Sequence, residues 1–257
     1  EAIVEQKDAK PVQLQIPEVN TGVMALTTEL LSAWLPQIGN QNAQGEYYLT
    51  DLIAIARSAG YSVRSVHPVS ASEVEGINSR QQLAALERVY QRQLADQLMA
   101  SGTSLADPAR FDQRGILNAG SDNFIDVNCL FEGTVSIGSN VRIGPNCQII
   151  NSQIGDGVEI KANTVIEQST IGDHAVLGPF ARIRPGTQLG SNTKVGNFVE
   201  TKKAIVGNGS KINHLSYVGD AELGENVNVG AGTITCNYDG VNKHRSTVGS
   251  HVKTGAS

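Results

Sequence analysis

The sequence predicts a chain in three parts: an α/β segment, one long helix, and a parallel β-helix built from six-residue repeats. Three observations support this. Helix and strand signals alternate up to about residue 78, apolar residues then recur at three- and four-residue steps, and from about residue 124 an aliphatic residue followed by glycine recurs about every six residues. Each period is typical of a different structure. We therefore expect boundaries that separate residues 1–78, 79–102 and 103–257.

The first part carries two helix signals and one strand signal. A helix is expected over residues 27–35, and Thr50 is placed to cap a second helix over residues 51–59, which Gly60 ends. Residues 61–66 alternate between apolar and polar side chains, as in a half-buried strand. This order of elements predicts an α/β fold.

Residues 79–102 carry the signals of one long helix. Ser79 can cap its start, and Gly102 can adopt the left-handed conformation that ends many helices. Five apolar residues form one stripe along it, namely Leu83, Leu86, Tyr90, Leu94 and Leu98. We interpret it as a packed linker helix rather than as a membrane or cofactor element.

The repeat explains a composition with 27 glycines and only 5% aromatic residues. Pairs such as Ile137-Gly138, Ile143-Gly144 and Leu177-Gly178 keep the six-residue step, and a small or β-branched residue follows four positions after each aliphatic. Three such units make a triangular coil with the aliphatic residue pointing inward, while Gly or Asn takes the turn. Because each coil is covered only by the next, stacking supplies the stability.

Composition excludes several classes of protein. The net charge of −5 argues against a broad nucleic-acid binder, and no stretch approaches the roughly 18 apolar residues of a membrane-spanning helix. The three cysteines, at positions 129, 147 and 236, suit neither a disulfide framework nor a zinc knuckle. We therefore expect a cytoplasmic protein without nucleic-acid or membrane partners. Since the chain opens without Met, we also expect that it begins inside a larger protein.

The first interruption of the repeat gathers charge on neighbouring coils. Thr201 fills a position where an aliphatic residue is expected, and Arg184 and Lys202 lie about one coil apart. Stacked coils would bring the two cations to strand spacing, roughly 5 Å, where both could hold one phosphate. The alternative is a solvated run of charges.

The second interruption surrounds His214. This residue lies roughly one coil beyond Glu200, so we expect a hydrogen bond from the imidazole to the carboxylate, which would fix the tautomer and raise the basicity of the ring. The alternative is a structural or surface histidine, as expected for the other four. Further on, the six-residue step is lost between Thr235 and Val248, which predicts a loop that leaves the coil.

Several runs together resemble one family, the bacterial bifunctional N-acetylglucosamine-1-phosphate uridylyltransferases and glucosamine-1-phosphate acetyltransferases. The resemblance covers essentially the whole chain in order. Its most specific runs are 178–186 (GPFARIRPG), 195–203 (VGNFVETKK), 214–220 (HLSYVGD) and 230–240 (GAGTITCNYDG), with weaker ones upstream at 3–8, 20–22, 42–48, 73–78 and 107–112. It implies a remnant of a Rossmann-like nucleotidyltransferase domain, followed by a left-handed parallel β-helix that forms a trimer and binds acetyl-CoA between subunits.

The resemblance also implies roles for individual residues. His214 matches the family's general base, which deprotonates the amino group of glucosamine 1-phosphate, and Glu200 would orient it. Sugar-phosphate contacts are implied for Arg184, Lys202, Tyr217, Asn228 and Lys243. Positions that contact the acetyl donor, acetyl-CoA, are Ala231, Asn237, Tyr238 and Ala256, the last replacing a serine of the relatives.

In the upstream part, Glu5 and Asn20 match contacts to N-acetylglucosamine, and Asn78 matches a substrate contact and a magnesium ligand of the site that uses UTP and makes UDP-N-acetylglucosamine. The family's Gly-rich nucleotide loop, with its Arg and Lys, and the aspartate that shares the magnesium ion are missing from this sequence. A polyphosphate site needs those charges. We therefore expect no uridylyltransferase activity from this chain alone. Its last repeats stop in mid-coil, so some acetyl-CoA contacts are expected to be missing.

Two other classes of function share the repeat. A regulatory β-helix that serves only assembly would give no reason for Arg184, Glu200, Lys202 and His214 to gather. A metalloenzyme of the carbonic anhydrase kind would need several histidines converging on zinc, and only His214 lies in the candidate region. The sequence therefore favours an amino-sugar phosphate N-acetyltransferase.

Overall fold

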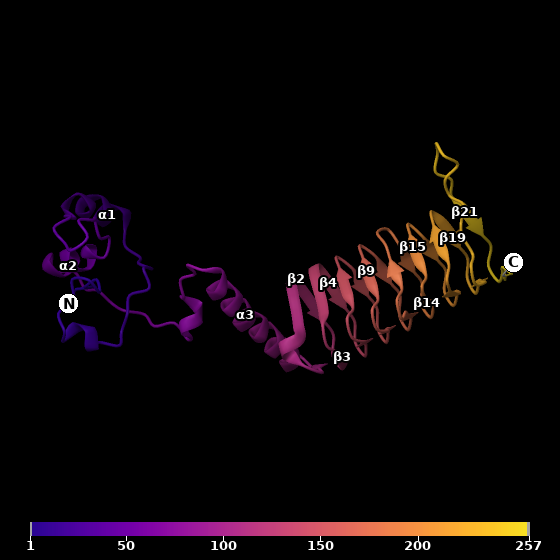
Figure 1. The fold of residues 1–257 in the computed structure, drawn as a ribbon, viewed down its shortest axis with the longest axis horizontal. Coiled ribbons are helices and arrows are strands. Elements are labelled where there is room, and N and C mark those ends of the chain that lie inside the picture. The colour runs from indigo at the N-terminus through magenta and orange to yellow at the C-terminus, as the bar shows by residue number, and fades with distance from the viewer. Residues whose placement is uncertain (1, 256–257) are drawn as a thin grey trace. The chain divides into compact units, whose positions relative to one another are not determined.

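The computed structural model describes residues 2–255, and its chain divides into two compact units between Leu83 and Ala84 (Figure 1). The first unit has a small core of Trp34, Ile38, Leu52 and Ala56. The second has one continuous core that runs from the end of a long helix through a stack of β-strands. The two units therefore have two separate cores.

Two short helices build the first unit, α1 (Thr28–Trp34) and α2 (Asp51–Ser58), with 3-10 turns η1 (Gln13–Gln15), η2 (Leu35–Gln37) and η3 (Ala71–Glu73). Thr27 caps α1 through its side-chain oxygen, which accepts from the backbone N–H of Leu30 at 3.4 Å. Gly60, at φ +83°, follows the end of α2 in the left-handed region that glycine tolerates. Both predicted helices are thus confirmed within one residue at each end.

Two expectations for this unit are wrong. Residues 61–66 form no strand, because among the described residues of this unit no other strand is present to pair with them; the Tyr61 ring instead packs edge-on against Trp34, with centroids 5.1 Å apart. Thr50 has helical backbone angles and its side chain caps nothing. Its hydroxyl donates to Glu5 Oε1 at 3.2 Å. A capping residue needs an extended backbone, which Thr50 does not adopt.

The long helix α3 (Arg80–Ala100) follows the predicted range, with Ser79 Oγ accepting from the N–H of Gln82 at 3.2 Å. Only the C-terminal half of its apolar stripe is buried, since Leu98 joins the β-helix core while Leu83 and Tyr90 are more than half exposed. Gln91 fastens this half of α3: its amide nitrogen donates to the carbonyl of Gln113, and its oxygen accepts from the Gln113 N–H, both at 2.8 Å.

The repeats form parallel strands in three rows, the three sides of the coil (Figure 1). The first row, one sheet, consists of β1 (Thr103–Leu105), β3 (Asn123–Ile125), β5 (Arg142–Ile143), β8 (Glu159–Ile160), β11 (Val176–Leu177), β14 (Lys194–Asn197), β17 (Lys211–His214) and β20 (Asn228–Val229). A 3-10 turn η4 (Pro108–Arg110) leads from β1 to the next row.

The second and third rows share the long strands β2 (Phe111–Ala119) and β4 (Cys129–Ile137), which run along both. The second row continues with β6 (Gln148–Ile150), β9 (Val165–Glu167), β12 (Arg182–Ile183), β15 (Glu200–Lys202) and β18 (Tyr217–Gly219). The third continues with β7 (Gln153–Ile154), β10 (Thr170–Ile171), β13 (Gln188–Leu189), β16 (Ile205–Val206), β19 (Ala221–Leu223) and β21 (Ser246–Val248).

The register shows why a six-residue period gives this architecture. Arg142, Glu159 and Val176 succeed one another in the first row, a step of 17 residues, which is about three repeat units. The aliphatic residue of each unit points inward and is buried, as are small residues such as Val141 and Ala175. Nearly every turn between strands has a left-handed residue, and asparagine or glycine occupies most of these positions. The predicted parallel β-helix is confirmed.

The predicted departure from the coil is also confirmed. Between β20 and β21 the chain leaves the stack as a loop, which projects beside β21 in Figure 1. An antiparallel bridge joins Tyr238 and Lys243 across this loop. Asp239 holds its tip, because its carboxylate accepts from the N–H groups of Val241 and Asn242 and contacts the ring of His244 at 2.6 Å. No helix among residues 2–255 is long and apolar enough to cross a membrane.

Candidate active site at one corner of the β-helix

The corner between the first and second rows changes its chemistry halfway along the stack. In the early coils its left-handed position holds Asn128, Asn146 and Asn163, whose amides bond to one another, as from Asn128 Nδ2 to Asn146 Oδ1 at 3.0 Å. In the later coils the same position holds Phe180, Phe198 and Leu215, with φ between +46° and +56° and side chains at least half exposed. We call these last three residues the apolar corner ladder.

Large apolar residues are uncommon in this conformation, because the left-handed region brings Cβ close to the following carbonyl. The rings of Phe180 and Phe198 stack with centroids 5.4 Å apart and planes 17° apart. Backbone strain of this kind clusters at functional sites. The apolar corner ladder therefore marks the coils in which a site is to be sought.

On the second-row side of this corner lie the cations that the sequence singled out. Arg184 and Lys202 are neighbours, since Ile183 pairs with Thr201 and the Arg184 N–H donates to the Thr201 carbonyl at 2.9 Å. Arg184 Nη1 donates to Glu200 Oε1 at 2.6 Å. This hydrogen bond is the main reason that the pKa of Arg184 lies above its ordinary value. The expected stacking of the two cations is present.

Tyr217 completes this group from the next coil. It pairs in register with Glu200, while Gly219 pairs with Lys202. A Cβ on Gly219 would lie 2.2 Å from the Tyr217 hydroxyl, so the phenol lies over this glycine. The position must stay glycine for the ring to lie along the strand there, with its hydroxyl beside the Lys202 position. Arg184, Glu200, Lys202 and Tyr217 thus share one patch, each only partly exposed.

The polar residue that interrupts the repeat, Thr201, points into the core and is fully buried. Its hydroxyl accepts from the hydroxyl of Thr187 at 3.2 Å, in the coil below. A buried hydroxyl without a partner would be costly, and this pair satisfies the requirement. Thr201 therefore supports the strand that carries Glu200 and Lys202 and does not face the patch.

On the first-row side of the corner, His214 ends β17 and lies in register with Asn197, which ends β14. The Nδ1 atom of His214 is 2.9 Å from Oδ1 of Asn197. The imidazole is exposed, while Asn197 is partly buried. The general base implied by the resemblance is therefore held by an amide from the preceding coil.

The expected hydrogen bond from His214 to Glu200 is wrong for this structure. The two residues lie on adjacent rows, on either side of the apolar corner ladder, and the Glu200 carboxylate is occupied by Arg184. The reason is the length of the coil. Counting 17 residues back from His214 leads to Asn197, whereas Glu200 is only 14 back. That count was the sequence signal that could have found Asn197.

The residues that the family resemblance assigns to acetyl-CoA binding lie in the segment after β20, where the chain leaves the coil. Ala231 is exposed just after β20, Asn237 donates its amide to the carboxylate of Asp220, and Tyr238 donates its hydroxyl to the Gly240 carbonyl at 2.6 Å. Ala256 lies outside the described residues.

Two implied sugar-phosphate contacts come from other elements than the patch. Asn228, in β20, is partly buried and pairs with Lys211. Lys243 is exposed in the loop that leaves the coil between β20 and β21.

The upstream site residues are spread over the first unit. Glu5 accepts from Thr50, Asn20 is exposed, and the backbone N–H of Asn78 donates to Gln82 Oε1 at 2.7 Å. Across the described part of the chain, no group of three or more His, Cys, Asp or Glu could hold a metal ion. Asn78 alone does not provide the several oxygen ligands that magnesium requires. These residues therefore do not form a magnesium site, and we assign no step to one.

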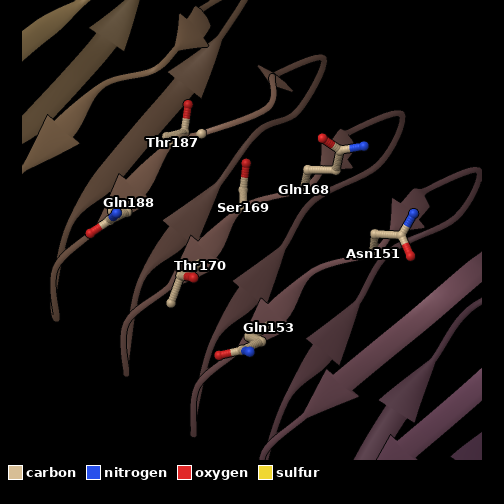
Figure 2. Close-up of a pocket in the computed structure, with 8 residues that line it drawn as sticks. Asn151, Gln153, Gln168, Ser169, Thr170, Thr187 and Gln188 are labelled. Atoms are coloured by element: carbon tan, nitrogen blue, oxygen red, sulfur yellow. The ribbon is translucent and has the colours of Figure 1, made fainter.

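A separate shallow groove of about 270 Å³ lies at the corner between the second and third rows (Figure 2). Its lining is made of amides, hydroxyls and one glycine, namely Asn151, Gln153, Gln168, Ser169, Thr170, Gly186, Thr187 and Gln188. None of these groups ionises or acts as a base near neutral pH. The groove is therefore a poorer candidate for the chemistry than the corner beside His214.

Comparison with known proteins relates the chain to several proteins of known name. A family model described as the GMPPB C-terminal domain matches residues 117–199. The chain is 63% identical over 256 residues to a protein named bifunctional protein GlmU from Marinobacter nauticus, and 53% identical over 254 residues to one of the same name from Burkholderia multivorans. These matches cover 100% and 99% of this chain but 56% of each relative.

Among solved structures, a UDP-N-acetylglucosamine acyltransferase from Bacteroides fragilis aligns with a TM-score of 0.44 and 16% identity, covering 52% of this chain and 66% of that one.

Proposed function

Because the chain is related along its whole length to bacterial GlmU proteins, we propose that it carries their acetyl-transfer site. The reaction would move an acetyl group from acetyl-CoA to the amino group of glucosamine 1-phosphate. The observation that carries the proposal is the gathering of His214, Arg184, Lys202 and Tyr217 around one corner of the β-helix. A β-helix that served only assembly would not need a base beside a cationic patch.

The chemistry assigns one task to each side of the corner. Nε2 of His214 would take a proton from the substrate amine while its nitrogen attacks the thioester carbonyl, and the thiolate of coenzyme A would then leave. Arg184 and Lys202 would hold the phosphate, since a guanidinium and an ammonium on neighbouring strands suit its oxygens. Glu200 would keep the guanidinium in place before the phosphate arrives.

The position of Lys243 and of the acetyl-CoA residues bears on the assembly. A loop that leaves the coil carries Asn237, Tyr238 and Lys243, and in our proposal it contributes these residues to a site shared with a neighbouring copy. We therefore propose a homotrimer with acetyl-CoA between adjacent chains. Sedimentation equilibrium of the purified protein would test it, and a monomer at all concentrations in the presence of acetyl-CoA would contradict it.

For the whole protein, the word bifunctional in the names of the relatives adds a second activity. We propose that this is uridylyl transfer from UTP to N-acetylglucosamine 1-phosphate, supported by magnesium and giving UDP-N-acetylglucosamine. Acetyl-CoA and UTP are cytoplasmic metabolites, so the cytoplasm is the proposed location. We assign no step of this second reaction to residues of the first unit.

The acetyl-transfer proposal is tested by measuring thiol release from acetyl-CoA with glucosamine 1-phosphate and with glucosamine. The phosphate ester should be the better substrate by about 10²-fold or more in kcat/KM, because two charge-assisted contacts are lost without it. Lys202→Ala should reduce that preference. Equal rates with both substrates would contradict the phosphate site, and no thiol release with either would leave the β-helix as an assembly module.

A further inference from the structure

We propose that Asn197 is the positioning residue for His214, and that Glu200 serves Arg184 instead. The Asn197 side-chain oxygen would hold the imidazole in the tautomer with its hydrogen on Nδ1, which leaves Nε2 with the lone pair that a base requires. This inference deepens the proposed acetyl transfer and rests on it for its chemical meaning. Its geometric content, the tautomer, can be measured without any activity.

The first observation is the contact itself. Nδ1 of His214 lies 2.9 Å from Oδ1 of Asn197, within hydrogen-bond distance. An amide oxygen only accepts hydrogen bonds, so Nδ1 must be the donor. Because a neutral imidazole has one N–H, the hydrogen on Nδ1 leaves Nε2 unprotonated.

The second observation is the backbone that holds the two residues. β14 and β17 each have four residues, whereas the strands before and after them in this row, such as β11 and β20, have two. Because of the extra residues, the pairing between β14 and β17 extends to Asn197 and His214, which lie directly before the corner. A Cβ on Gly196 would lie 1.9 Å from the Asn213 carbonyl oxygen, so the two strands approach too closely there for any larger residue. The pair is therefore held by rigid backbone.

No structural role in the turn explains why an asparagine is present at position 197. The asparagines of the early coils occupy the left-handed corner position and bond to each other, but in this coil that position belongs to Phe198. Asn197 is the last residue of the strand and is not among the residues with positive φ. Its one side-chain hydrogen bond within residues 2–255 is the contact to His214.

The ionisable groups around the imidazole are few. Lys194 on β14 and Lys211 on β17 face each other in register, three residues before the Asn197–His214 pair, and β20 contributes none. Across the corner, the Glu200 carboxylate is paired with Arg184, and Tyr217 lies above it. A carboxylate placed at position 197 would therefore be the dominant new charge beside the ring.

The first test reads the tautomer directly. Selective ¹⁵N-histidine labelling of the purified protein distinguishes Nδ1–H from Nε2–H imidazoles by their nitrogen shifts, and the His214 signal is assigned by its loss in His214→Gln. We expect Nδ1–H in the parent protein and a mixture of both tautomers in Asn197→Ala. An Nε2–H imidazole in the parent protein, or one tautomer that Asn197→Ala leaves unchanged, would overturn the proposal even if acetyl transfer is real.

The second test uses the charge of the partner. Asn197→Asp should move the acidic limb of the pH–rate profile, and the midpoint of the His214 nitrogen titration, about one unit to higher pH, because a carboxylate stabilises the imidazolium. Asn197→Ala should lower kcat about 10- to 100-fold with a smaller change in KM, and Asn197→Asp should restore most of that loss. Asn192→Asp, an equal charge change on an exposed residue of the same coil, should move neither quantity.

The outcomes separate the two hypotheses. If Glu200→Gln moves the titration midpoint to lower pH while Asn197→Asp leaves it in place, Glu200 is the partner and the inference is wrong. If neither the parent protein nor any variant releases thiol from acetyl-CoA, the proposed function is wrong. The tautomer and the titration of His214 still decide whether Asn197 positions the imidazole.

Discussion

The early and the late coils of the β-helix fold by the same rule but use different residues at one corner. After β3, β5 and β8 the left-handed position between the first and second rows holds asparagine, and after β11, β14 and β17 it holds Phe180, Phe198 and Leu215. Both stretches keep a buried aliphatic core and parallel register. The difference therefore owes nothing to the needs of the fold.

That comparison shows how a solenoid accommodates a site. A bulky residue in the left-handed region costs on the order of 1 kcal/mol relative to asparagine or glycine, and an exposed side chain recovers little of it by burial. The early coils avoid the cost. The late coils carry it three times in succession, between the cationic patch of Arg184 and Lys202 and the imidazole of His214. A local departure from the repeat thus indicates where the chain carries a functional site.

The strongest way to break the late coils is Gly196→Ala. The new Cβ would lie 1.9 Å from the backbone oxygen of Asn213, which neither strand can avoid without losing register. Overpacking against backbone of this kind should cost about 3 kcal/mol, seen as a lower midpoint in urea unfolding. Gly249→Ala is the matched control, because its Cβ would meet nothing within 4 Å. Equal midpoints for the two variants would show that the late coils tolerate a backbone shift.

The next effect concerns the charges that distinguish the late coils. Arg184→Ala should raise KM for glucosamine 1-phosphate and lower kcat/KM by about 10- to 100-fold, because a bidentate cation beside Lys202 is lost. The control is Arg142→Ala in the early coils, where the guanidinium lies 5.1 Å from the Phe124 ring centre. That variant should keep its kinetics. A similar loss in both would mean that the effect is structural.

A smaller effect follows from exchanging the corner residues themselves. Phe198→Asn should leave stability unchanged or raise it by up to about 1 kcal/mol, since asparagine tolerates φ near +55° and only an exposed ring stack is lost. Asn163→Phe should lower stability by about 1 kcal/mol in the early coils. Chemical unfolding of both variants checks the sign. A clear loss in Phe198→Asn would mean that the apolar corner ladder stabilises the fold.

The smallest effect is a pH dependence in the loop that leaves the coil. Hydrogen bonds from the Asn242 N–H, the His244 ring and the Val241 N–H lower the pKa of Asp239 from 3.8 to about 2. A lowered pKa adds stability above the unfolded value that is lost as the pH falls from about 4 towards 2. The amide protection factors of residues 237–244, which are exchange rates corrected for their intrinsic pH dependence, should therefore fall over that window, and Asp239→Asn should remove the pH step. Equal protection factors at pH 5 and pH 2 would contradict it.

The fold was largely predictable because its period is local. Each coil needs an inward aliphatic residue and a turn residue, and both recur in the sequence with little interference from distant contacts. The strand expected over residues 61–66 failed for the opposite reason. Its alternation was real, but a strand exists only beside another, and none is present among the described residues of that unit.

The contacts among the candidate site residues were predictable only in part. Arg184 and Lys202 lie one full coil apart, so their stacking followed from the repeat. His214 was matched to Glu200 because the two residues lie roughly one coil apart, yet the 17-residue coil places Asn197 in register with it. A difference of three residues in the count moves the partner to another row, since the backbone register decides which side chains meet.

The most direct measurement compares two histidines, one from each stretch of coils. His214 ends a strand beside the cationic patch, while His174 is an exposed left-handed turn residue of the early coils. Asparagine at either position cannot act as a base. His214→Asn should reduce the rate of thiol release from acetyl-CoA with glucosamine 1-phosphate by about 10²- to 10⁴-fold, and His174→Asn should leave it unchanged. Equal rates in the two variants would contradict the account.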